Sequence, residues 1–383
     1  MGAKRLTGMR DFALEAYFSR WSGSVRHNLA ASDSETVGMA DLLARADPED
    51  AARWQDLRLA YTAPRGAPWL RQTIAEGYEA VAPDDIVCFA GAGEGIHVAM
   101  HALLGRDDHA IVIVPNYQSA ETIPRGLCAV SGVALDAARG WTLDIDAVAD
   151  AFRPGTRLVA INFPNNPTGK ILERDRFDAL VALCRSRGAW LFSDEVYRLI
   201  ERDPAQRLPQ AADVYERGVS LNVLSKAYGL PGLRIGWIAC RDRAVASRLE
   251  RLKHYLSLCN SAPSEVLSNI ALKSGSALLD RNRRLADRNL ALVDRFFAAH
   301  PALFAWHRPE GGVIGYPRYV GAEGVEAFAQ RLIERSGVLV LPASLFRSDL
   351  VSLPDDRFRI GFGRANLPES LDALERHLAS ARG

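Results

Sequence analysis

Short apolar runs alternate with helix-like segments between about residues 86 and 240. Few polar residues interrupt the runs, which is typical of strands buried on both faces of a sheet. The segments between them, such as 94–104 and 173–187, have helical periodicity, and the second ends at Gly188. This alternation predicts an α/β fold with a mostly parallel, mixed sheet between helices. The predicted strands are Ile86–Ala90, Ala110–Val114, Leu158–Phe163, Ala189–Ser193, Val219–Leu224 and Ile235–Cys240.

The pattern changes after about residue 261. One long helix is predicted there, followed by short strands and a final helix, which together make an α+β arrangement. These elements are expected at 278–300, 338–341, 358–362 and 368–380.

The 383 residues are enough for two domains. The residues before Pro48 have no complete core pattern of their own, so we expect them to pack on the C-terminal part. We therefore predict a large domain of residues 46–275 and a small domain formed by residues 1–45 and 276–383.

Composition and charge exclude several classes of partner. The 47 basic and 46 acidic side chains leave a net charge of +1, which gives no reason to expect a nucleic-acid or membrane partner. The polar start of the chain is not a secretory signal, Leu6 does not fit a myristoylation motif, and no apolar run approaches the ~20 residues of a membrane span. Five scattered cysteines form no Cys-x-x-Cys pair, which argues against disulfides and a metal site. We expect a cytoplasmic protein without a metal.

Lys226 stands at the end of the apolar run 219–224, and a turn-rich stretch with three glycines follows it. Ser225 and Arg234 flank it with a hydroxyl and a planar guanidinium, both of which bind phosphate. A lysine between phosphate-binding groups suits a Schiff-base nucleophile for a phosphorylated aldehyde. A surface lysine in a loop is the alternative interpretation.

Two other strand ends carry polar groups. Asn166 belongs to an Asn-Pro-Thr-Gly turn that fixes the direction of its amide, although Asn-Pro turns are also common at helix entries. Asp194 and Tyr197 follow a buried run, and a carboxylate there is costly to bury unless it is paired. A helix N-cap at Asp194 is the alternative.

A glycine-rich loop, residues 91–96, lies between a predicted strand and a helix and forms a potential anion site. The dinucleotide-binding motif Gly-x-Gly-x-x-Gly would need glycine at Ile96, which weakens the case for an NAD-dependent dehydrogenase. Tyr117 follows the run 110–114 as the aromatic residue of a Pro-x-aromatic sequence. There it either stacks on a ligand ring or packs at the strand end.

These segments resemble, in order and separation, the motifs of class I/II aminotransferases, the aspartate-aminotransferase-like family of fold-type I pyridoxal-phosphate enzymes. The resemblance covers nearly the whole chain and implies pyridoxal 5′-phosphate as the cofactor. It assigns Lys226 as the Schiff-base lysine and Asp194 as the partner of the pyridinium nitrogen. Asn166 and Tyr197 would donate to the phenolate oxygen of the cofactor. Tyr197 would be catalytic together with Lys226 and Asp194, and Asn166 would also bind the substrate.

The same resemblance assigns the remaining positions. Arg359, on the segment 357–363, would clamp the substrate carboxylate, with Arg364 as a rival. Tyr61 would reach the phosphate in the partner subunit, which implies a homodimer. The second aromatic residue of the Pro-x-aromatic element is replaced by Ala120. The cofactor-binding residues would be Ala92, Gly93 and Glu94 through their backbone, and Tyr117, Ser225 and Arg234.

The function implied is an aminotransferase that moves an amino group between an L-amino acid and a 2-oxo acid. A lyase, a cyclase with capreomycidine-synthase-like chemistry or an oxidase would use the same core. A transcription regulator with this fold would need a DNA-binding extension, and only about 45 residues precede the large domain. The motifs do not identify the substrate. The aromatic residues near the N-terminus, which suit either a lid or small-domain packing, are Phe12, Tyr17, Phe18 and Trp21.

Overall fold

A mostly parallel, mixed sheet lies at the centre of the fold, as predicted, and it has seven strands where six were predicted. The computed structural model describes residues 10–21 and 23–380. All neighbouring strands of the sheet are parallel except β8, which is antiparallel to both of its neighbours. In spatial order the strands are β2 (Ile86–Phe89), β8 (Gly236–Ala239), β7 (Gly218–Val223), β6 (Trp190–Asp194), β5 (Thr156–Asn162), β3 (His109–Val114) and β4 (Ala129–Ala134).

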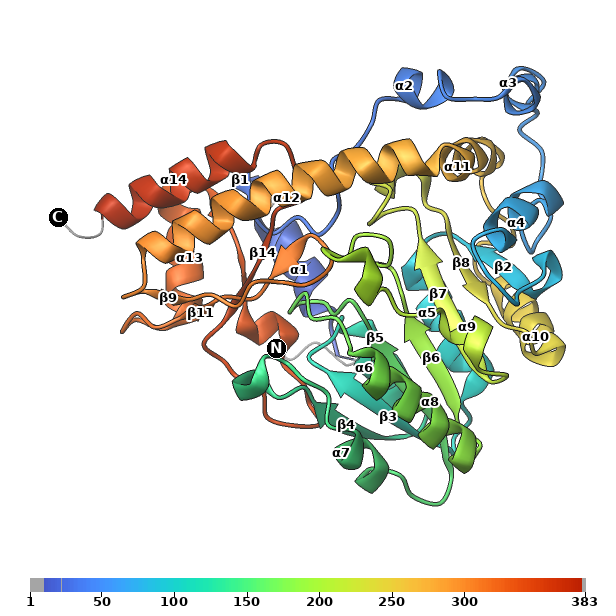
Figure 1. Cartoon of the computed structure of the whole chain (residues 1–383), viewed down its shortest axis with the longest axis horizontal. Coiled ribbons are helices and arrows are strands. Elements are labelled where there is room, and N and C mark those ends of the chain that lie inside the picture. Colours follow the sequence, from blue (N-terminus) through green and yellow to red (C-terminus); the bar gives the residue numbers. More distant parts are fainter. Residues whose placement is uncertain (1–9, 22, 381–383) are drawn as a thin grey trace, which may run out of the picture.

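Helices cover both faces of this sheet (Figure 1). Strand β3 illustrates the burial, because Ala110 and Val112 belong to one hydrophobic cluster and Ile111 and Ile113 to another. Each alternate set of side chains therefore meets its own layer of helices, which explains why the runs contain so few polar residues. The helices of this part are α4 (Pro68–Ala75), α5 (Ala92–Leu103), α6 (Ser119–Leu127), α7 (Ile145–Asp150), α8 (Arg174–Arg187), α9 (Ala211–Val214), α10 (Arg243–Lys253) and α11 (Ala262–Lys273).

Strand β4 was not among the predicted strands. It lies at the edge of the sheet, and most of its side chains are partly or fully exposed. An edge strand of this kind lacks the continuous apolar run from which the other six were predicted.

Both ends of the chain contribute to a second group of elements. Strand β1 (His27–Asn28) pairs with β12 (Val338–Leu339), and β14 (Phe358–Gly361) lies between β10 (Ile314–Gly315) and β13 (Leu341–Pro342). Figure 1 shows α12 running from α11 towards α13 and α14. The division into two domains stays a prediction. The other elements are α1 (Ala13–Trp21), α2 (Met39–Leu43), α3 (Pro48–Gln55), α12 (Gly275–Ala299), β9 (Phe304–Ala305), β11 (Arg318–Tyr319), α13 (Val325–Ser336) and α14 (Leu367–Ser380).

Among residues 10–21 and 23–380, no helix is both long enough and apolar enough to span a bilayer.

Candidate active site

A cavity of about 280 Å³ lies beyond the carboxyl ends of the parallel strands. Open α/β sheets bind their ligands at this edge. Most of the side chains predicted from the sequence line it, although they come from widely separated parts of the chain. These are Ala92, Gly93, Tyr117, Asn166, Asp194, Tyr197, Ser225, Lys226, Arg234 and Arg359.

Lys226 is held at the cavity by Ser32. Its Nζ donates a hydrogen bond to Ser32 Oγ over 2.9 Å and lies 5.9 Å from the ring centre of Tyr197. Burial and the positive charge of Arg359 lower the pKa of Lys226 to about 8, against the opposing effect of nearby carboxylates. The neutral amine, which a nucleophile requires, is therefore far more populated near physiological pH than in an ordinary lysine.

Asp194 is the last residue of β6 and is buried. One carboxylate oxygen accepts a hydrogen bond from the backbone N–H of Val196 over 3.2 Å. Burial raises the pKa of Asp194 to about 7. Residues 196–199 form a turn and not a helix, so Asp194 is not a helix N-cap. A protonated ring nitrogen is the kind of partner that a buried carboxylate needs.

A hydrogen-bonded chain joins the ends of β5 and β6 to β14. The side chain of Asn162 donates to the carbonyl oxygen of Asp194 over 3.0 Å and accepts from the backbone N–H of Asn166 over 2.8 Å. The amide oxygen of Asn166 in turn accepts from Arg359 over 3.0 Å. This chain fixes the Asn166 amide in a way that the turn motif alone does not.

Arg359 is almost completely buried, with an exposed fraction of 2 %. Besides Asn166, its guanidinium donates to the carbonyl oxygen of Ala30 over 2.8 Å, while Nε has no hydrogen-bond partner among the described residues. An arginine buried without a carboxylate partner is ready to bind an anionic ligand. The rival Arg364 already pairs with Asp33, at a shortest distance of 2.6 Å.

The start of α5 also lines the cavity, through Ala92 and Gly93. Backbone N–H groups at a helix start favour an anion, and Ser225 and Arg234 line the same cavity. Gly91 is required here, because its φ is +93° and an added Cβ would collide with the guanidinium of Arg234. These groups fit a phosphate.

The Glu94 side chain is held by two backbone N–H groups. Its carboxylate accepts hydrogen bonds from the backbone N–H groups of Ala90, at 2.6 Å, and Ser257, at 3.1 Å. Glu94 is not among the residues that line the cavity, so only its backbone N–H is suited to the predicted role.

Three predicted tyrosines lie in different surroundings. Tyr197 donates its hydroxyl to the carbonyl oxygen of Ser32 over 2.9 Å, and Tyr117 donates to Glu15 over 3.0 Å. Both line the cavity, whereas Tyr61 does not and is 87 % exposed.

The sequence predictions missed several residues of the cavity, among them the polar residues Ser32 and Glu15. Neither stands next to a strand end or within a glycine-rich turn, so no local pattern marks them. Of the four N-terminal aromatic residues, Phe18 lines the cavity and Phe12 packs against Tyr117, with ring centres 5.0 Å apart.

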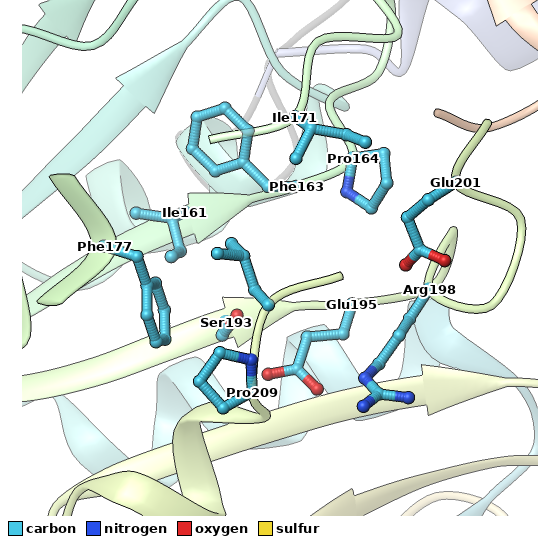
Figure 2. A pocket seen from close by; sticks show the side chains of 11 residues that line it. Ile161, Phe163, Pro164, Ile171, Phe177, Ser193, Glu195, Arg198, Glu201 and Pro209 are labelled. Carbon is cyan, nitrogen blue, oxygen red and sulfur yellow. The ribbon is translucent and has the colours of Figure 1, made fainter. Parts of the chain in front are cut away.

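A separate cavity of only about 20 Å³ lies between β5, β6 and their loops. Figure 2 shows its apolar end at Ile161 and Phe177 and its polar end at Glu195 and Arg198. This volume holds about one water molecule. Glu195 is satisfied internally by Ala211, Ser220 and Asn222, so this space is not a substrate site.

Comparison with known proteins adds independent information. A family model described as aminotransferase class I and II matches residues 29–374. Capreomycidine synthase from Streptomyces vinaceus is 32% identical over 76% of this chain and 74% of that protein. The arginine–pyruvate transaminase AruH from Pseudomonas aeruginosa is 34% identical over 75% of this chain and 74% of its own length. The solved structure of a PLP-dependent aminotransferase from Streptococcus suis superposes with a TM-score of 0.90 at 28% identity, covering 97% of this chain and 98% of the other.

Proposed function

Because the chain belongs to the aminotransferase class I and II family and is a pyridoxal-phosphate-dependent aminotransferase, we propose that Lys226 is its Schiff-base lysine. The enzyme moves an amino group from an amino acid to a 2-oxo acid. One observation carries the assignment of the site. A nucleophilic lysine, a buried carboxylate and a buried arginine meet in a single cavity, as Lys226, Asp194 and Arg359.

The phosphate end of the cofactor binds at the start of α5. The backbone N–H groups of Ala92, Gly93 and Glu94 point from a helix N-terminus, which favours an anion. Ser225 adds a hydroxyl donor and Arg234 a planar cation.

The ring end of the cofactor binds between strand ends. Asp194 would pair with the ring nitrogen, and the amide of Asn166 would donate to the phenolate oxygen. The Tyr197 hydroxyl has one proton, so it would exchange its bond to the Ser32 carbonyl for one to the same phenolate oxygen. The aromatic face of Tyr117 covers the ring. When bound, the cofactor supplies an aldehyde for Lys226 and a ring that withdraws electrons from the substrate Cα.

Arg359 and Lys226 act on the substrate. The Arg359 guanidinium holds the α-carboxylate through two parallel hydrogen bonds, which orients the Cα–H bond. Lys226 Nζ, once displaced by the substrate amine, accepts the proton from Cα, because its lowered pKa of about 8 makes the neutral amine far more accessible than in an ordinary lysine. The Lys226 ammonium group would then donate this proton to the C4′ carbon of the cofactor.

We also propose that the enzyme is a homodimer in which Tyr61 reaches the phosphate of the partner subunit. In a single chain Tyr61 is 87 % exposed, and Leu59 and Tyr255 are almost equally exposed. Exposed large apolar residues of this kind suit a subunit interface.

The purified holoenzyme tests the reaction directly. Arginine and pyruvate are the first pair to assay, because one relative is named an arginine–pyruvate transaminase. The amino acid alone should change the visible band of the cofactor, and pyruvate should restore it with formation of an equal amount of alanine. Borohydride reduction followed by peptide mass spectrometry should place the cofactor on Lys226. An adduct on another lysine contradicts the assignment.

Cyclisation of an amino acid is the second candidate reaction, favoured by the relative named capreomycidine synthase. A cyclase needs no 2-oxo acid to complete its turnover. Sustained turnover without any 2-oxo acid, and without amino-group transfer to pyruvate, would therefore favour cyclisation or elimination over transamination.

A further inference from the structure

Five charged side chains line the cavity in the described part of the chain. The proposed function uses four of them: Lys226 for the aldehyde, Asp194 for the ring nitrogen, Arg234 for the phosphate and Arg359 for the α-carboxylate. Glu15 remains without a role. A carboxylate in a substrate cavity favours a cation and disfavours an anion.

Glu15 lies on α1 beside two apolar residues that line the same cavity, Leu14 and Phe18. The hydroxyl of Tyr117 donates to one of its carboxylate oxygens, Oε1, over 3.0 Å. The other oxygen, Oε2, accepts no hydrogen bond from the described residues. The carboxylate is thus oriented by one partner and has an oxygen available to a ligand.

Helix α1 is fixed against the cavity wall by Gln118. The amide oxygen of Gln118 accepts from the backbone N–H of Ala13 over 2.9 Å, and its amide nitrogen donates to the carbonyl oxygen of Asp11 over 2.8 Å. The ring of Phe12 packs on Tyr117. The position of Glu15 is therefore determined by contacts at both the start of the helix and its own side chain.

Glu15 also acts electrostatically on the site. Burial and Arg359 lower the pKa of Lys226, and Glu15 opposes that change together with Asp33 and Asp194. Glu15 and Arg359 also interact electrostatically. When a substrate carboxylate neutralises Arg359, this cation no longer balances the negative charge of Glu15. A cation on the substrate side chain would restore it.

We propose that Glu15 binds the cationic end of the substrate side chain, so that the amino acid carries a guanidinium or ammonium group at the end of a long aliphatic chain. This inference rests on the proposed function. The methylene groups pack on Leu14, and the aromatic face of Phe18 offers a further contact for the cation. Glu15 is then the residue that determines specificity at the side-chain end of the cavity.

The experiment compares L-arginine with L-citrulline, which has nearly the same shape but no charge. For each amino acid, the rate and half-saturation of the change in the visible band are measured with the holoenzyme. Arginine should be preferred by about 10- to 100-fold, the range expected for a charge-assisted hydrogen bond. Lysine should also be preferred over the uncharged norleucine.

Two variants locate the effect. Glu15→Gln should bring the preference for arginine over citrulline, measured as the ratio of their rates divided by half-saturation, close to one. Glu15→Arg should make glutamate a better substrate than arginine. Glu334→Gln removes the same charge from an exposed position on α13 and should keep the ratio of the unmodified enzyme. Circular dichroism checks that each variant is folded.

Equal rates for arginine and citrulline in the unmodified enzyme would overturn the inference without any variant. An unchanged ratio in a folded Glu15→Gln variant would overturn it as well. In both cases the proposed transamination still stands. If no amino acid changes the visible band, the proposed function fails and this inference fails with it.

Discussion

The amide oxygen of Asn166 accepts a hydrogen bond from the guanidinium of Arg359 over 3.0 Å, although 193 positions separate the two residues in the chain. Both side chains are buried, with exposed fractions of 8 % and 2 %. The contact connects the turn after β5 with strand β14, so the residue assigned to the cofactor and the residue assigned to the substrate carboxylate orient each other.

Replacement of Arg359 by lysine should impair substrate binding more than cofactor binding. Lysine keeps the charge but cannot make two parallel hydrogen bonds to a carboxylate while also reaching Asn166. The expected loss in kcat/KM is on the order of 2–5 kcal/mol, with a raised KM. Steady-state kinetics and the cofactor content of the purified variant measure the two effects.

Arg364→Lys is the matched control for this prediction. Arg364 pairs with Asp33 and does not line the cavity, so its replacement should have a small effect on KM. Loss of activity in Arg364→Lys but not in Arg359→Lys would show that the carboxylate clamp is assigned to the wrong arginine.

Asp194→Asn should stabilise the cofactor-free protein at neutral pH. Burial raises the pKa of Asp194 from 3.8 to about 7, so its contribution to stability is present below the unfolded pKa and is lost as the pH rises through the folded pKa. Asparagine has no charge to bury. The variant should therefore gain free energy of unfolding relative to the unmodified protein, up to about 4 kcal/mol between acidic and neutral pH.

Urea unfolding of both cofactor-free proteins at several pH values measures this difference, which should grow from about pH 4 to about pH 7. The same substitution should strongly slow the first half-reaction of the holoenzyme, because the ring nitrogen loses its anionic partner. If the difference in free energy of unfolding between the two proteins stays constant from about pH 4 to about pH 7, the raised pKa of Asp194 is contradicted.

Ser32→Ala should lower kcat about tenfold or less, because one hydrogen bond to Lys226 Nζ is worth roughly 1 kcal/mol. Ser32 is a positioning residue, so the pH profile distinguishes its role from a structural one. The lost acceptor stabilised the protonated amine, and the acidic limb of the kcat profile should therefore move to lower pH. Ser32→Thr, which keeps a hydroxyl, should restore the profile. An unchanged acidic limb in Ser32→Ala would contradict this role.

Tyr61→Phe should weaken cofactor binding at the partner's site. Mixed dimers of Tyr61→Phe and Lys226→Ala test this arrangement, because one of the two sites then contains both native residues. Activity should reappear on mixing the two inactive or weakened proteins under conditions of subunit exchange. No recovery, or a monomer in analytical ultracentrifugation, would rule out the proposed role across subunits.

The sequence predicted six of the seven strands, the five inner ones and the edge strand β2, because each is buried on both faces, which leaves a continuous apolar run. The predicted 110–114, for example, corresponds to β3 at His109–Val114. The long helix predicted at 278–300 corresponds to α12 at Gly275–Ala299, since its helical period is repeated over many turns. The exposed edge strand β4 provides no such run.

Cavity residues were predictable where local chemistry is unusual, such as the lysine that follows β7 or the carboxylate that ends β6. Ser32 and Glu15 carry no such signal. They reach the cavity only because β1 pairs with β12 and because Gln118 holds α1, and both contacts join residues that are distant in the chain. The ion pair between Arg364 and Asp33 likewise depends on tertiary structure.

With α1 held by Gln118 and Glu15 proposed as its specificity residue, the choice of substrate and the chemistry of the reaction lie on different elements. Helix α1 has nine residues, and it precedes in sequence every residue assigned to the cofactor. Changes in these few positions would alter the side-chain end of the cavity while keeping Lys226, Asp194 and Arg359 themselves unchanged. A short N-terminal segment is thus a module for diversification, and grafting α1 from a relative of different specificity is a direct route to retargeting this enzyme.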